Sequence, residues 1–273
     1  MTILITGATG NVGRPLVEQL LSAGHRVRAL TRNPPHANLP AEAEVVAGDL
    51  GDVSTLAEAF AGVTALHLIG FGSDYEPLTN APDIVDLAVS AGVQKATILR
   101  GDVEKGPVEV AVEASPLEWT FLSPVEFMAN TLEWAETIKA EGVVREGFVT
   151  MRSAMVHEAD IASVAAAVLT SDGHAKQDYF LTGPEALTPP EKVRTISEGL
   201  GRDIAFVELT EEEVVASWRA AGFSDTDVEY FRMVRTNPPE AAYTPLPTVE
   251  QVTGVPARTY AQWVKENAAS FTR

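Results

Sequence analysis

The chain begins with a glycine-rich turn between an apolar strand and an amphipathic helix. Residues 3–6 are expected to form the strand, and glycines follow at positions 7, 10 and 13. In such a turn one glycine permits the tight bend, the next lets the backbone approach a phosphate, and the last lets the helix pack closely on the strand. The helix N-terminus adds free N–H groups and a partial positive charge. The context predicts a dinucleotide pyrophosphate site formed by Gly7, Thr9, Gly10, Asn11, Val12 and Gly13.

The spacing of these glycines is Gly-x-x-Gly-x-x-Gly rather than the more common Gly-x-Gly-x-x-Gly. Pro15 fits a helix that starts here, because proline is tolerated in the first helical turn. A glycine triplet also occurs in tight turns that hold no ligand, and this is the alternative. The position of these glycines between a strand and a helix favours a nucleotide-binding turn over a turn without a ligand.

Composition narrows the class of protein. With 273 residues and 45% hydrophobic residues, the chain can bury a sizeable core. It has no long apolar run, no apparent signal peptide and no cysteine, so we expect a cytoplasmic protein without disulfides or thiolate nucleophiles. The net charge of −18 argues against nucleic acid or an anionic membrane as a partner.

Strand-like and helix-like segments alternate through the first half of the chain. The expected strands cover residues 25–31, 44–47, 63–69, 95–99 and 117–122, and helices are expected at 82–91 and 108–114. Strands joined through helices make right-handed crossovers, so the predicted fold class is α/β with a Rossmann-like, doubly wound parallel sheet. Ligands of such sheets bind beyond the carboxyl ends of the strands. One edge should therefore gather the loops that start at Gly7, Arg32, Asp49, Gly70, Arg100 and Ser123.

The pattern changes after about residue 125. We expect residues 1–125 to form the nucleotide-binding domain and residues 126–273 a smaller α/β lobe that binds substrate and is interleaved with the first domain. Two helices should start at Thr188 and Thr210, each followed three residues later by glutamate as in a capping box. Residues 235–247 are expected to be irregular, before a final helix at about 260–271.

Further motifs accompany the glycine turn. Arg-Asn-Pro stands at 32–34, Gly-Asp-Leu at 48–50, Trp-Thr-Phe-Leu-Ser-Pro at 119–124, and His-Glu-Ala-Asp-Ile-Ala at 157–162. Over nearly the whole chain these motifs resemble the NmrA-like branch of the atypical short-chain dehydrogenase/reductases. The resemblance implies NAD(P)H binding. That family contains quinone reductases, azoreductases, tailoring enzymes of aromatic natural products, and redox-sensing regulators that bind the nucleotide without turning it over.

The chain departs from the superfamily's usual catalytic pattern. That pattern pairs a tyrosine acid with a lysine three or four residues away, because the lysine lowers the tyrosine pKa. No Tyr-x-x-x-Lys occurs here, and Ser123 stands where relatives have arginine. Carbonyl reduction by a tyrosine relay is therefore not expected, and the catalytic residues are not identified. Hydride transfer to a quinone needs less acid assistance and stays open.

Arg32 follows the second expected strand, where the adenosine ribose should lie. No acidic residue stands there to bind the 2′-hydroxyl of NAD, and Arg32, helped by Arg14, can pair with a 2′-phosphate. NADP(H) is therefore favoured and NAD(H) stays open. The alternative for Arg32 is a solvated surface residue. The family resemblance implies that Asp49, with Leu50 beside it, faces the adenine, although Asp49 could instead cap the following helix.

The nicotinamide end of the cofactor is expected near Gly70, Phe71 and Arg100. The Phe71 side chain could pack against the nicotinamide ring, or Gly70 and Phe71 could form an ordinary turn. The predicted substrate pocket consists of Tyr75, Phe127, Asn130, Trp134 and His157. For the aromatic residues of that set, a place in the core is the alternative.

Other titratable residues are given structural roles. His67 is expected in the core, and no metal site is expected because none of the five histidines has metal-ligand spacing. Lys105 and Glu109 are expected to form a surface pair four residues apart on a helix.

Three functions follow from this pattern. The favoured one is an NAD(P)H-dependent oxidoreductase that acts on a small quinone-like or polycyclic aromatic substrate by direct hydride transfer. The first alternative is a tailoring oxygenase of an aromatic polyketide pathway that uses NAD(P)H. The second is a non-catalytic NAD(P) sensor, and only this alternative requires a protein partner.

Overall fold

The computed structural model describes residues 1–72, 76–101 and 104–272. Two compact units share the chain: unit 1 consists of Met1–Pro124, Glu158–Leu181 and Thr248–Val255, and unit 2 of Val125–His157, Thr182–Pro247 and the residues from Pro256 onward. The expected boundary at 125/126 lies one residue from the first passage between units. Residues 158–181 and 248–255, which the sequence analysis assigns to the second lobe, belong instead to unit 1.

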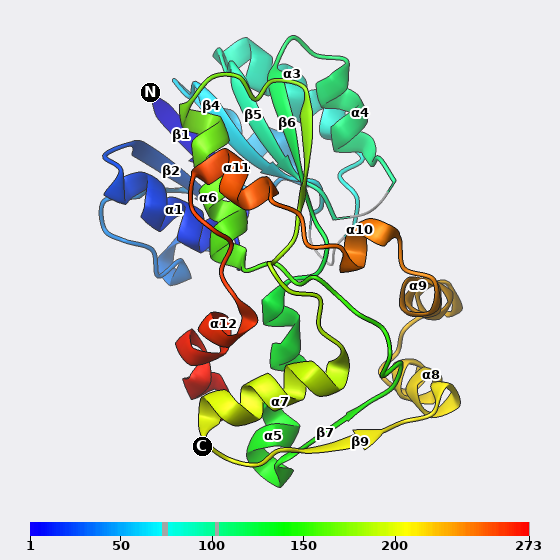
Figure 1. Ribbon diagram of the computed structural model, residues 1–273. Helices are drawn as coiled ribbons and strands as arrows, with labels where there is room; N and C mark the ends of the chain where they lie inside the picture. The colour runs from blue at the N-terminus through cyan, green and yellow to red at the C-terminus, as the bar shows by residue number, and fades with distance from the viewer. Residues whose placement is uncertain (73–75, 102–103, 273) are drawn as a thin grey trace. The chain divides into compact units, whose positions relative to one another are not determined.

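A seven-stranded parallel sheet forms the centre of unit 1 (Figure 1). Its strands are β1 (Thr2–Ile5), β2 (Arg26–Thr31), β3 (Glu44–Ala47), β4 (Ala65–Ile69), β5 (Lys95–Leu99), β6 (Glu118–Pro124) and β8 (Gln177–Leu181). Their order in the sheet is β3-β2-β1-β4-β5-β6-β8. The predicted fold class and the six strands expected in the first half are confirmed.

The order of the strands reverses at β1. Ile5 of β1 pairs with Ala29 of β2 on one side and with His67 of β4 on the other. The chain first runs outward through β2 and β3 and then returns to place β4 on the free side of β1. Such a switch point leaves a crevice beyond the carboxyl ends of the strands, where α/β sheets bind their ligands. Gly7 follows β1 at this point.

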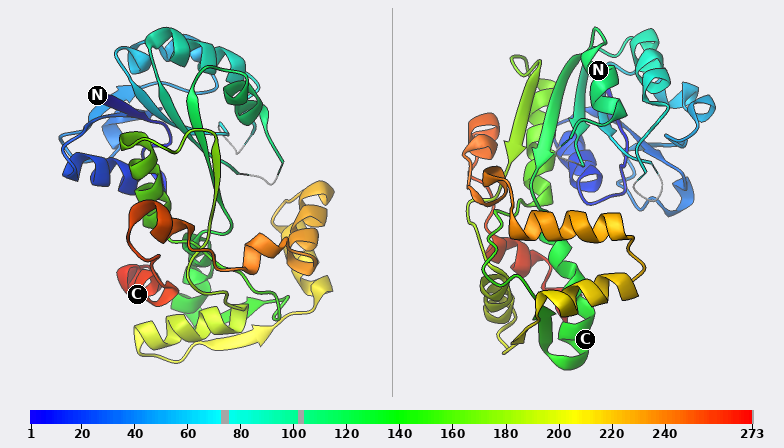
Figure 2. Two further views of the ribbon diagram at one scale, coloured as in Figure 1. Left: turned by 45° about the horizontal axis from the view of Figure 1, so that its top comes forward. Right: turned by 90° about the vertical axis from the view of Figure 1, so that its right-hand side faces the viewer.

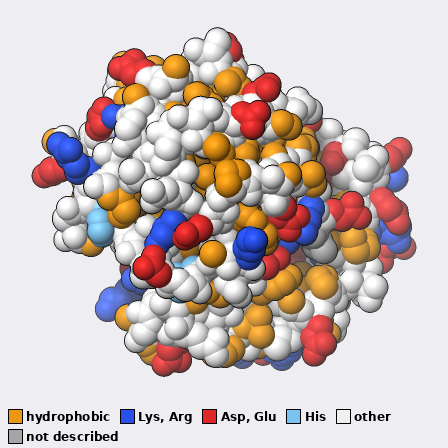
Figure 3. Space-filling view, turned by 90° about the horizontal axis from the view of Figure 1, so that it is seen from above, with side chains coloured by type: hydrophobic (Ala, Val, Ile, Leu, Met, Phe, Trp, Pro, Cys, Tyr) orange, Lys and Arg blue, Asp and Glu red, His pale blue; other side chains and the backbone are white. Residues whose placement is uncertain are grey.

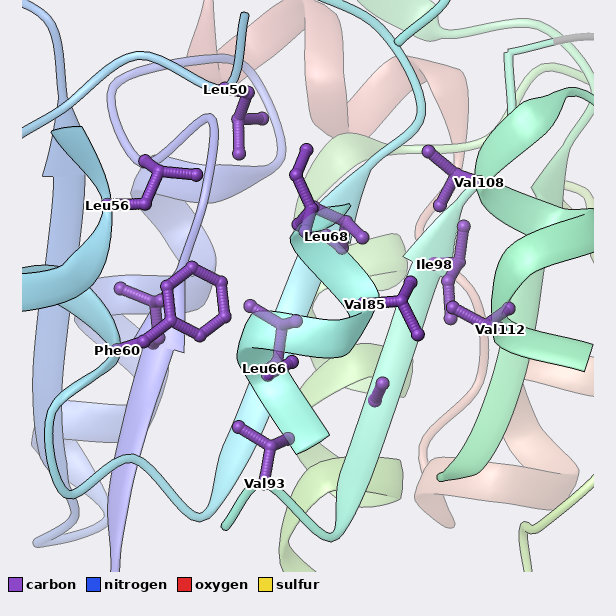
Figure 4. Close-up of a cluster of buried hydrophobic side chains, with 14 of the residues drawn as sticks. Leu50, Leu56, Phe60, Leu66, Leu68, Val85, Val93, Ile98, Val108 and Val112 are labelled. Atoms are coloured by element: carbon purple, nitrogen blue, oxygen red, sulfur yellow. The ribbon is translucent and has the colours of Figure 1, made fainter. Parts of the chain in front are cut away.

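Helices cover both faces of the sheet. One face carries α1 (Gly13–Ser22), α6 (Glu158–Thr170) and α11 (Thr248–Thr253), and the other carries α2 (Ala57–Phe60), α3 (Ala81–Ala91) and α4 (Pro107–Glu113) (Figures 1 and 2). Leu56 and Phe60 from the α2 region pack with strand residues such as Leu66 and Ile98 in a buried apolar cluster (Figure 4). Burial of these side chains provides the main stabilisation of the sheet that positions the site.

Strand β8 is an element that the sequence analysis misses. It adds to β6 as a parallel edge strand, with Phe121 opposite Asp178 and Leu122 opposite Tyr179. Four of its five residues are partly or fully exposed. An edge strand with one exposed face does not need the apolar run that marks the buried strands. Its apolar part is only Tyr179, Phe180 and Leu181 after two polar residues, which is too short a run to mark a buried strand.

Unit 2 is built mainly from helices around a two-stranded parallel sheet. The strands are β7 (Val143–Glu146) and β9 (Ala205–Glu208). The helical segments are η4 (Met128–Trp134), α5 (Ala135–Glu141), α7 (Pro189–Leu200), α8 (Glu211–Ala220), α9 (Asp225–Thr236), α10 (Glu240–Tyr243), α12 (Tyr260–Glu266) and η5 (Ala268–Phe271). Its core contains Ile138, Ile196, Trp263 and Phe271.

The capping boxes predicted at Thr188 and Thr210 are confirmed at the starts of α7 and α8. Two more, at Ser224 and Thr259, start α9 and α12. The expectation of an irregular segment at 235–247 is wrong in part, because α9 runs to Thr236 and α10 forms a further helical turn. Among the described residues, no helix has the length and apolar character needed to cross a membrane.

Acidic and basic side chains are scattered over the face of the molecule that Figure 3 shows. In the face drawn in Figure 3 they are interspersed with apolar groups, and the described side chains of that face form no continuous basic field.

Candidate functional site

A cavity of about 310 Å³ opens beyond the carboxyl ends of β1, β2, β3 and β4 in unit 1. This volume is at the lower end of the range for small-molecule sites. The lining residues are Gly7, Thr9, Leu30, Thr31, Arg32, Asn33, His36, Gly48, Asp49, Leu50, Ile69, Phe71 and Gly72. The cavity therefore lies at the switch point of the sheet, where the glycine turn also lies.

The glycine turn has the geometry that the sequence predicts. Gly7 has φ +59°, a conformation in which a side chain is disfavoured, and the N–H of Gly10 donates to its carbonyl at 2.9 Å. A Cβ on Gly13 would lie 2.1 Å from Gly7 O, so glycine alone permits this approach of the helix to the turn. The three glycines bring the first turn of α1 close against the end of β1.

The N-terminus of α1 suits an anion. The helix begins at Gly13, and among the described residues no side chain caps it and no acidic residue lies in its first turn. Arg14 N–H donates to Gly10 O at 3.1 Å and Pro15 has no N–H, so the partial positive charge of this helix end is what favours a phosphate here. The turn fits the pyrophosphate of a dinucleotide.

Six of the predicted cofactor residues line the cavity. They are Gly7, Thr9, Arg32, Asp49, Leu50 and Phe71. Gly10, Asn11, Val12 and Gly13 lie in the turn and at the start of α1 without lining the cavity, and Val12 is buried. Gly70 follows β4 directly beside Phe71 and is likewise outside the lining. For these residues, contact with the cofactor stays a prediction.

The end of β2 brings two basic side chains to the cavity. Arg32 and His36 both line it, with Asn33 between them, and Pro34–His36 form a single 3-10 turn. His36 is not among the cofactor residues predicted above, although a second basic residue four positions after Arg32 is a usable signal. Arg14, which was considered a helper for the phosphate, instead donates to the carbonyls of Ala37 and Asn38. It thereby holds the loop that follows His36.

The Asp49 carboxylate organises the turn after β3. Its Oδ1 accepts the N–H of Gly51 at 2.9 Å. The alternative role as a helix cap is wrong, because Asp52 caps the following 3-10 turn (Val53–Thr55) and accepts from Ser54 N at 3.0 Å. Asp49 therefore remains a residue of the cavity wall.

The ring of Phe71 packs beside the backbone that follows β5. A Cβ on Gly101 would lie 3.6 Å from Cδ1 of the Phe71 ring. The carboxyl ends of β4 and β5 therefore place an aromatic ring next to an exposed glycine at the edge of the sheet. A nicotinamide ring can stack on such a surface.

Arg100 does not line the cavity, and its buried guanidinium belongs to a cluster of polar side chains. Its Nη1 donates to Asp178 Oδ2 at 3.1 Å and to Ser123 Oγ at 3.4 Å, and its Nε lies 3.8 Å from Glu109 Oε1. Ser123 Oγ in turn donates to Asp178 Oδ1 at 2.5 Å. The guanidinium fixes the end of β5 to β6, β8 and α4, and direct contact with the cofactor stays a prediction.

The expected surface pair of Lys105 with Glu109 is wrong. Lys105 Nζ binds Glu113 Oε1 at 2.7 Å, and Glu109 is buried beside Arg100. The physical reason is that α4 begins at Pro107, so Lys105 precedes the helix and the spacing of four does not place the two side chains on one helical face.

The predicted substrate residues belong to different surroundings. Tyr75 lies outside the described residues. In unit 2, Asn130 is exposed, Phe127 is half-buried, and Trp134 packs in the core cluster. His157 is buried with its Nε2 3.1 Å from Glu266 Oε2. Trp134 therefore has the packing role that was its alternative, and a substrate contact of the other residues stays a prediction.

His67 is confirmed as a core residue. It is fully buried in β4, and its Nδ1 lies 2.9 Å from Thr97 Oγ1. Burial lowers the pKa of His67 from 6.5 to about 4, because the charged imidazole would lose its hydration. His67 is therefore neutral at physiological pH and has a structural role in the sheet.

Comparison with known proteins identifies the fold and its cofactor. A family model described as NAD(P)H-binding matches residues 7–101. The chain is 34% identical to the (4-alkanoyl-5-oxo-2,5-dihydrofuran-3-yl)methyl phosphate reductase of Streptomyces griseus, over 98% of this chain and 99% of the relative. It is 31% identical to the NAD(P)H azoreductase of Xenophilus azovorans, over 98% and 99% of the two chains.

The fold also matches a solved structure along its whole length. The NADPH-dependent quinone oxidoreductase of Escherichia coli, determined in complex with NADPH, superposes with a TM-score of 0.80 at 24% identity, over 97% of this chain and 99% of that one. The matched domain model spans the glycine turn, the cavity and the end of β5. The chain belongs to the NmrA-like branch of the atypical short-chain dehydrogenase/reductases and is an NAD(P)H-dependent oxidoreductase.

Proposed function

We propose that the protein is an NADPH-dependent reductase that passes a hydride to a small, conjugated acceptor of the quinone-like or polycyclic aromatic class. It does so without the tyrosine and lysine of the superfamily. The observation that supports the proposal is the cavity at the switch point, bounded by the Gly7 turn on one side and by Arg32 and His36 on the other. NADPH fits this pairing of an anion-binding turn with two basic side chains.

The preference for NADPH over NADH rests on the end of β2. Arg32, Asn33 and His36 line the cavity where a 2′-phosphate is expected, and Asp49 lines it from the turn after the neighbouring strand β3. A guanidinium and an imidazole both donate hydrogen bonds to phosphate, whereas the 2′-hydroxyl of NAD calls for a carboxylate directly after β2. We therefore infer that this chain favours the phosphorylated nucleotide.

The class of acceptor follows from what the chain lacks and from its relatives. Bound NADPH would supply the hydride. Without Tyr-x-x-x-Lys, an acceptor that already delocalises the incoming electrons is favoured over a simple ketone. The named relatives act on a quinone, an azo compound and a furanone phosphate ester, each of which has a conjugated acceptor.

A second candidate substrate is a conjugated lactone that carries a phosphate ester. The observation that favours it is the 34% identity, over almost the full length of both chains, to the furanone phosphate reductase. Reduction of its carbon–carbon double bond uses the same hydride source and the same class of conjugated carbonyl. The two candidates differ in the acceptor alone.

A rapid-mixing experiment tests the proposal. The protein is premixed with NADPH and then mixed with 2-methyl-1,4-naphthoquinone, an azo dye or a furanone phosphate ester, and nucleotide absorbance is followed. We expect oxidation of NADPH with at least one conjugated acceptor and none with a simple ketone. Binding of NADPH without consumption by any acceptor would contradict the reductase and support the sensor. Consumption of NADPH that requires dissolved oxygen, and not the conjugated compound alone, would support the tailoring oxygenase.

A further inference from the structure

Arg14 links the glycine turn of unit 1 to the loop that follows β2. It belongs to the first turn of α1, directly after Gly13. Its Nη2 donates to the carbonyl of Ala37 at 3.1 Å, and its Nη1 donates to the carbonyl of Asn38. The planar guanidinium presents its N–H groups as a rigid fork, so this one side chain holds two successive carbonyls in a fixed geometry.

The two carbonyls lie at the end of the short turn that carries His36. The chain forms a single 3-10 turn that ends at His36, and the N–H of Ala37 donates back to Pro34 O at 3.2 Å. The next residue, Asn38, has φ +47°, in the left-handed region that few residue types other than glycine tolerate. A backbone in such a conformation persists where surrounding contacts hold it. The fork of Arg14 supplies such a contact from another element of the same unit.

The position of the His36 imidazole depends on this backbone. His36 is exposed and lines the cavity beside Arg32 and Asn33. Within the part of the chain that the structure describes, no hydrogen bond or ion pair holds the imidazole. The conformation of the turn therefore determines where the ring lies on the cavity wall.

Arg14 adds positive charge to a region that is already positive. The N-terminal end of α1 carries a partial positive charge, and among the described residues no acidic side chain lies in its first turn. No carboxylate of the described residues forms an ion pair with Arg14 either. A cation at this end of a helix is electrostatically unfavourable unless an anion lies nearby. The placement of Arg14 therefore suits a site that binds phosphate groups.

We propose that Arg14 is a positioning residue for the selection of NADPH over NADH. By holding the two loop carbonyls, it keeps His36 on the cavity wall, where the imidazole and the Arg32 guanidinium together bind the 2′-phosphate. Arg14 acts through the loop, because both of its Nη atoms donate to loop carbonyls. The inference rests on the proposed preference for NADPH and adds to it the residue that shapes the 2′-phosphate site.

This arrangement separates the groups that bind the phosphate from the group that positions them. A neutral imidazole has one N–H that donates to a phosphate oxygen, and a guanidinium has five. Arg14 acts on the first of these donors, through the residue that directly follows His36. Loss of the fork should therefore weaken NADPH binding no more than loss of the imidazole does. Both changes should leave NADH, which has no 2′-phosphate, nearly unaffected.

The test uses Arg14→Lys, His36→Ala and the variant that combines them. Lysine keeps the positive charge, but its ammonium group does not reproduce the planar fork on two carbonyls. The matched control is Arg28→Lys, because Arg28 of β2 also donates to three backbone carbonyls, those of the α2 region, and does not line the cavity.

The measurement is the Kd of four ligands by isothermal titration calorimetry, together with the melting temperature of each variant. The ligands are NADPH, NADH, adenosine 2′,5′-bisphosphate and adenosine 5′-monophosphate. The two adenosine phosphates differ in the 2′-phosphate and lack the nicotinamide, so their binding reports on the 2′-phosphate site without any turnover.

In the wild type, NADPH should bind more tightly than NADH, and the bisphosphate more tightly than the monophosphate. His36→Ala should raise the Kd of NADPH and of the bisphosphate about tenfold, as expected for loss of one hydrogen bond to a charged group. Arg14→Lys should raise the same two values about three- to tenfold, and the Kd of NADH and of the monophosphate should change by less than about twofold.

The combined variant should bind NADPH as His36→Ala does, because no imidazole is left for Arg14 to position. Arg28→Lys should lower the melting temperature and keep the wild-type ratio of the Kd values for NADH and NADPH. A merely structural role of Arg14 would give the result of this control.

A wild type that binds NADH as tightly as NADPH would contradict the proposed preference itself, and the role of Arg14 falls with it. With the preference intact, an Arg14→Lys protein that keeps the wild-type ratio of the two Kd values would overturn the positioning role. Weaker NADPH binding by the combined variant than by His36→Ala would overturn it as well, since Arg14 would then act independently of His36.

Discussion

Replacing Gly13 by alanine should weaken nucleotide binding and also lower the stability of the fold. The new Cβ would lie 2.1 Å from Gly7 O and 2.8 Å from Ala8 Cα, whereas ordinary contact begins at 3.4 Å. Both obstructing atoms belong to the backbone, so no side-chain rotation relieves the overlap. The turn between β1 and α1 must therefore open by about 1 Å.

Two opposing effects set the change in stability. Overpacking of this kind costs about 1–3 kcal/mol of unfolding free energy. Alanine recovers up to about 1 kcal/mol because it is a better helix former than glycine. The binding site has no such compensation. Loss of one charge-assisted hydrogen bond to phosphate costs about 1.5–3 kcal/mol, so the Kd for NADPH should rise about ten- to a hundredfold.

The assay is a fluorescence titration with NADPH, with the melting temperature measured in parallel by circular dichroism. The matched control is Gly199→Ala in α7 of unit 2, where a Cβ would lie 2.6 Å from Cγ1 of Val264. That variant should also lose stability but keep the wild-type Kd. A Gly13→Ala protein that binds NADPH as tightly as the wild type would refute the placement of the pyrophosphate on this turn.

Three further predictions concern unit 1. Arg32→Ala should weaken NADPH binding about ten- to a hundredfold and leave NADH binding nearly unchanged in titrations, and equal weakening of both nucleotides would contradict its contact with the 2′-phosphate. The pKa of His67 is about 4 in the fold against 6.5 unfolded, so the unfolded chain binds the proton first as the pH falls. Urea unfolding should therefore show that the free energy of unfolding falls by about 3 kcal/mol between pH 7 and pH 4. The His67→Asn variant should lack this pH dependence, and its absence in the wild type would contradict the burial of His67. Arg100→Met leaves the buried Glu109 without its partner and should cost about 3 kcal/mol or more in urea unfolding, and a cost below about 1 kcal/mol would contradict the buried network.

Local patterns in the sequence determine much of unit 1. Strands such as 95–99 are buried on both faces, so their apolar runs mark them in the sequence. The glycine turn was equally visible, because its spacing encodes a close contact between neighbouring segments. The capping boxes at Thr188 and Thr210 were found for the same reason, since cap and partner are three residues apart.

The features of the site that could not be predicted from the sequence depend on contacts between segments that are far apart along the chain. Arg100 follows a strand, as a cofactor residue would, yet its partners Ser123 and Asp178 come from β6 and from the unpredicted β8.

The most direct test of hydride transfer is the kinetic isotope effect on a single turnover. The protein is mixed with NADPH deuterated at either of the two C4 positions and with a conjugated acceptor such as 2-methyl-1,4-naphthoquinone, and oxidation of the nucleotide is timed. Because a fold-bound nicotinamide presents one face to the acceptor, we predict slower oxidation for one deuterated epimer and unchanged oxidation for the other. Equal rates for both epimers and for unlabelled NADPH, or binding with no oxidation, would contradict direct hydride transfer by this protein.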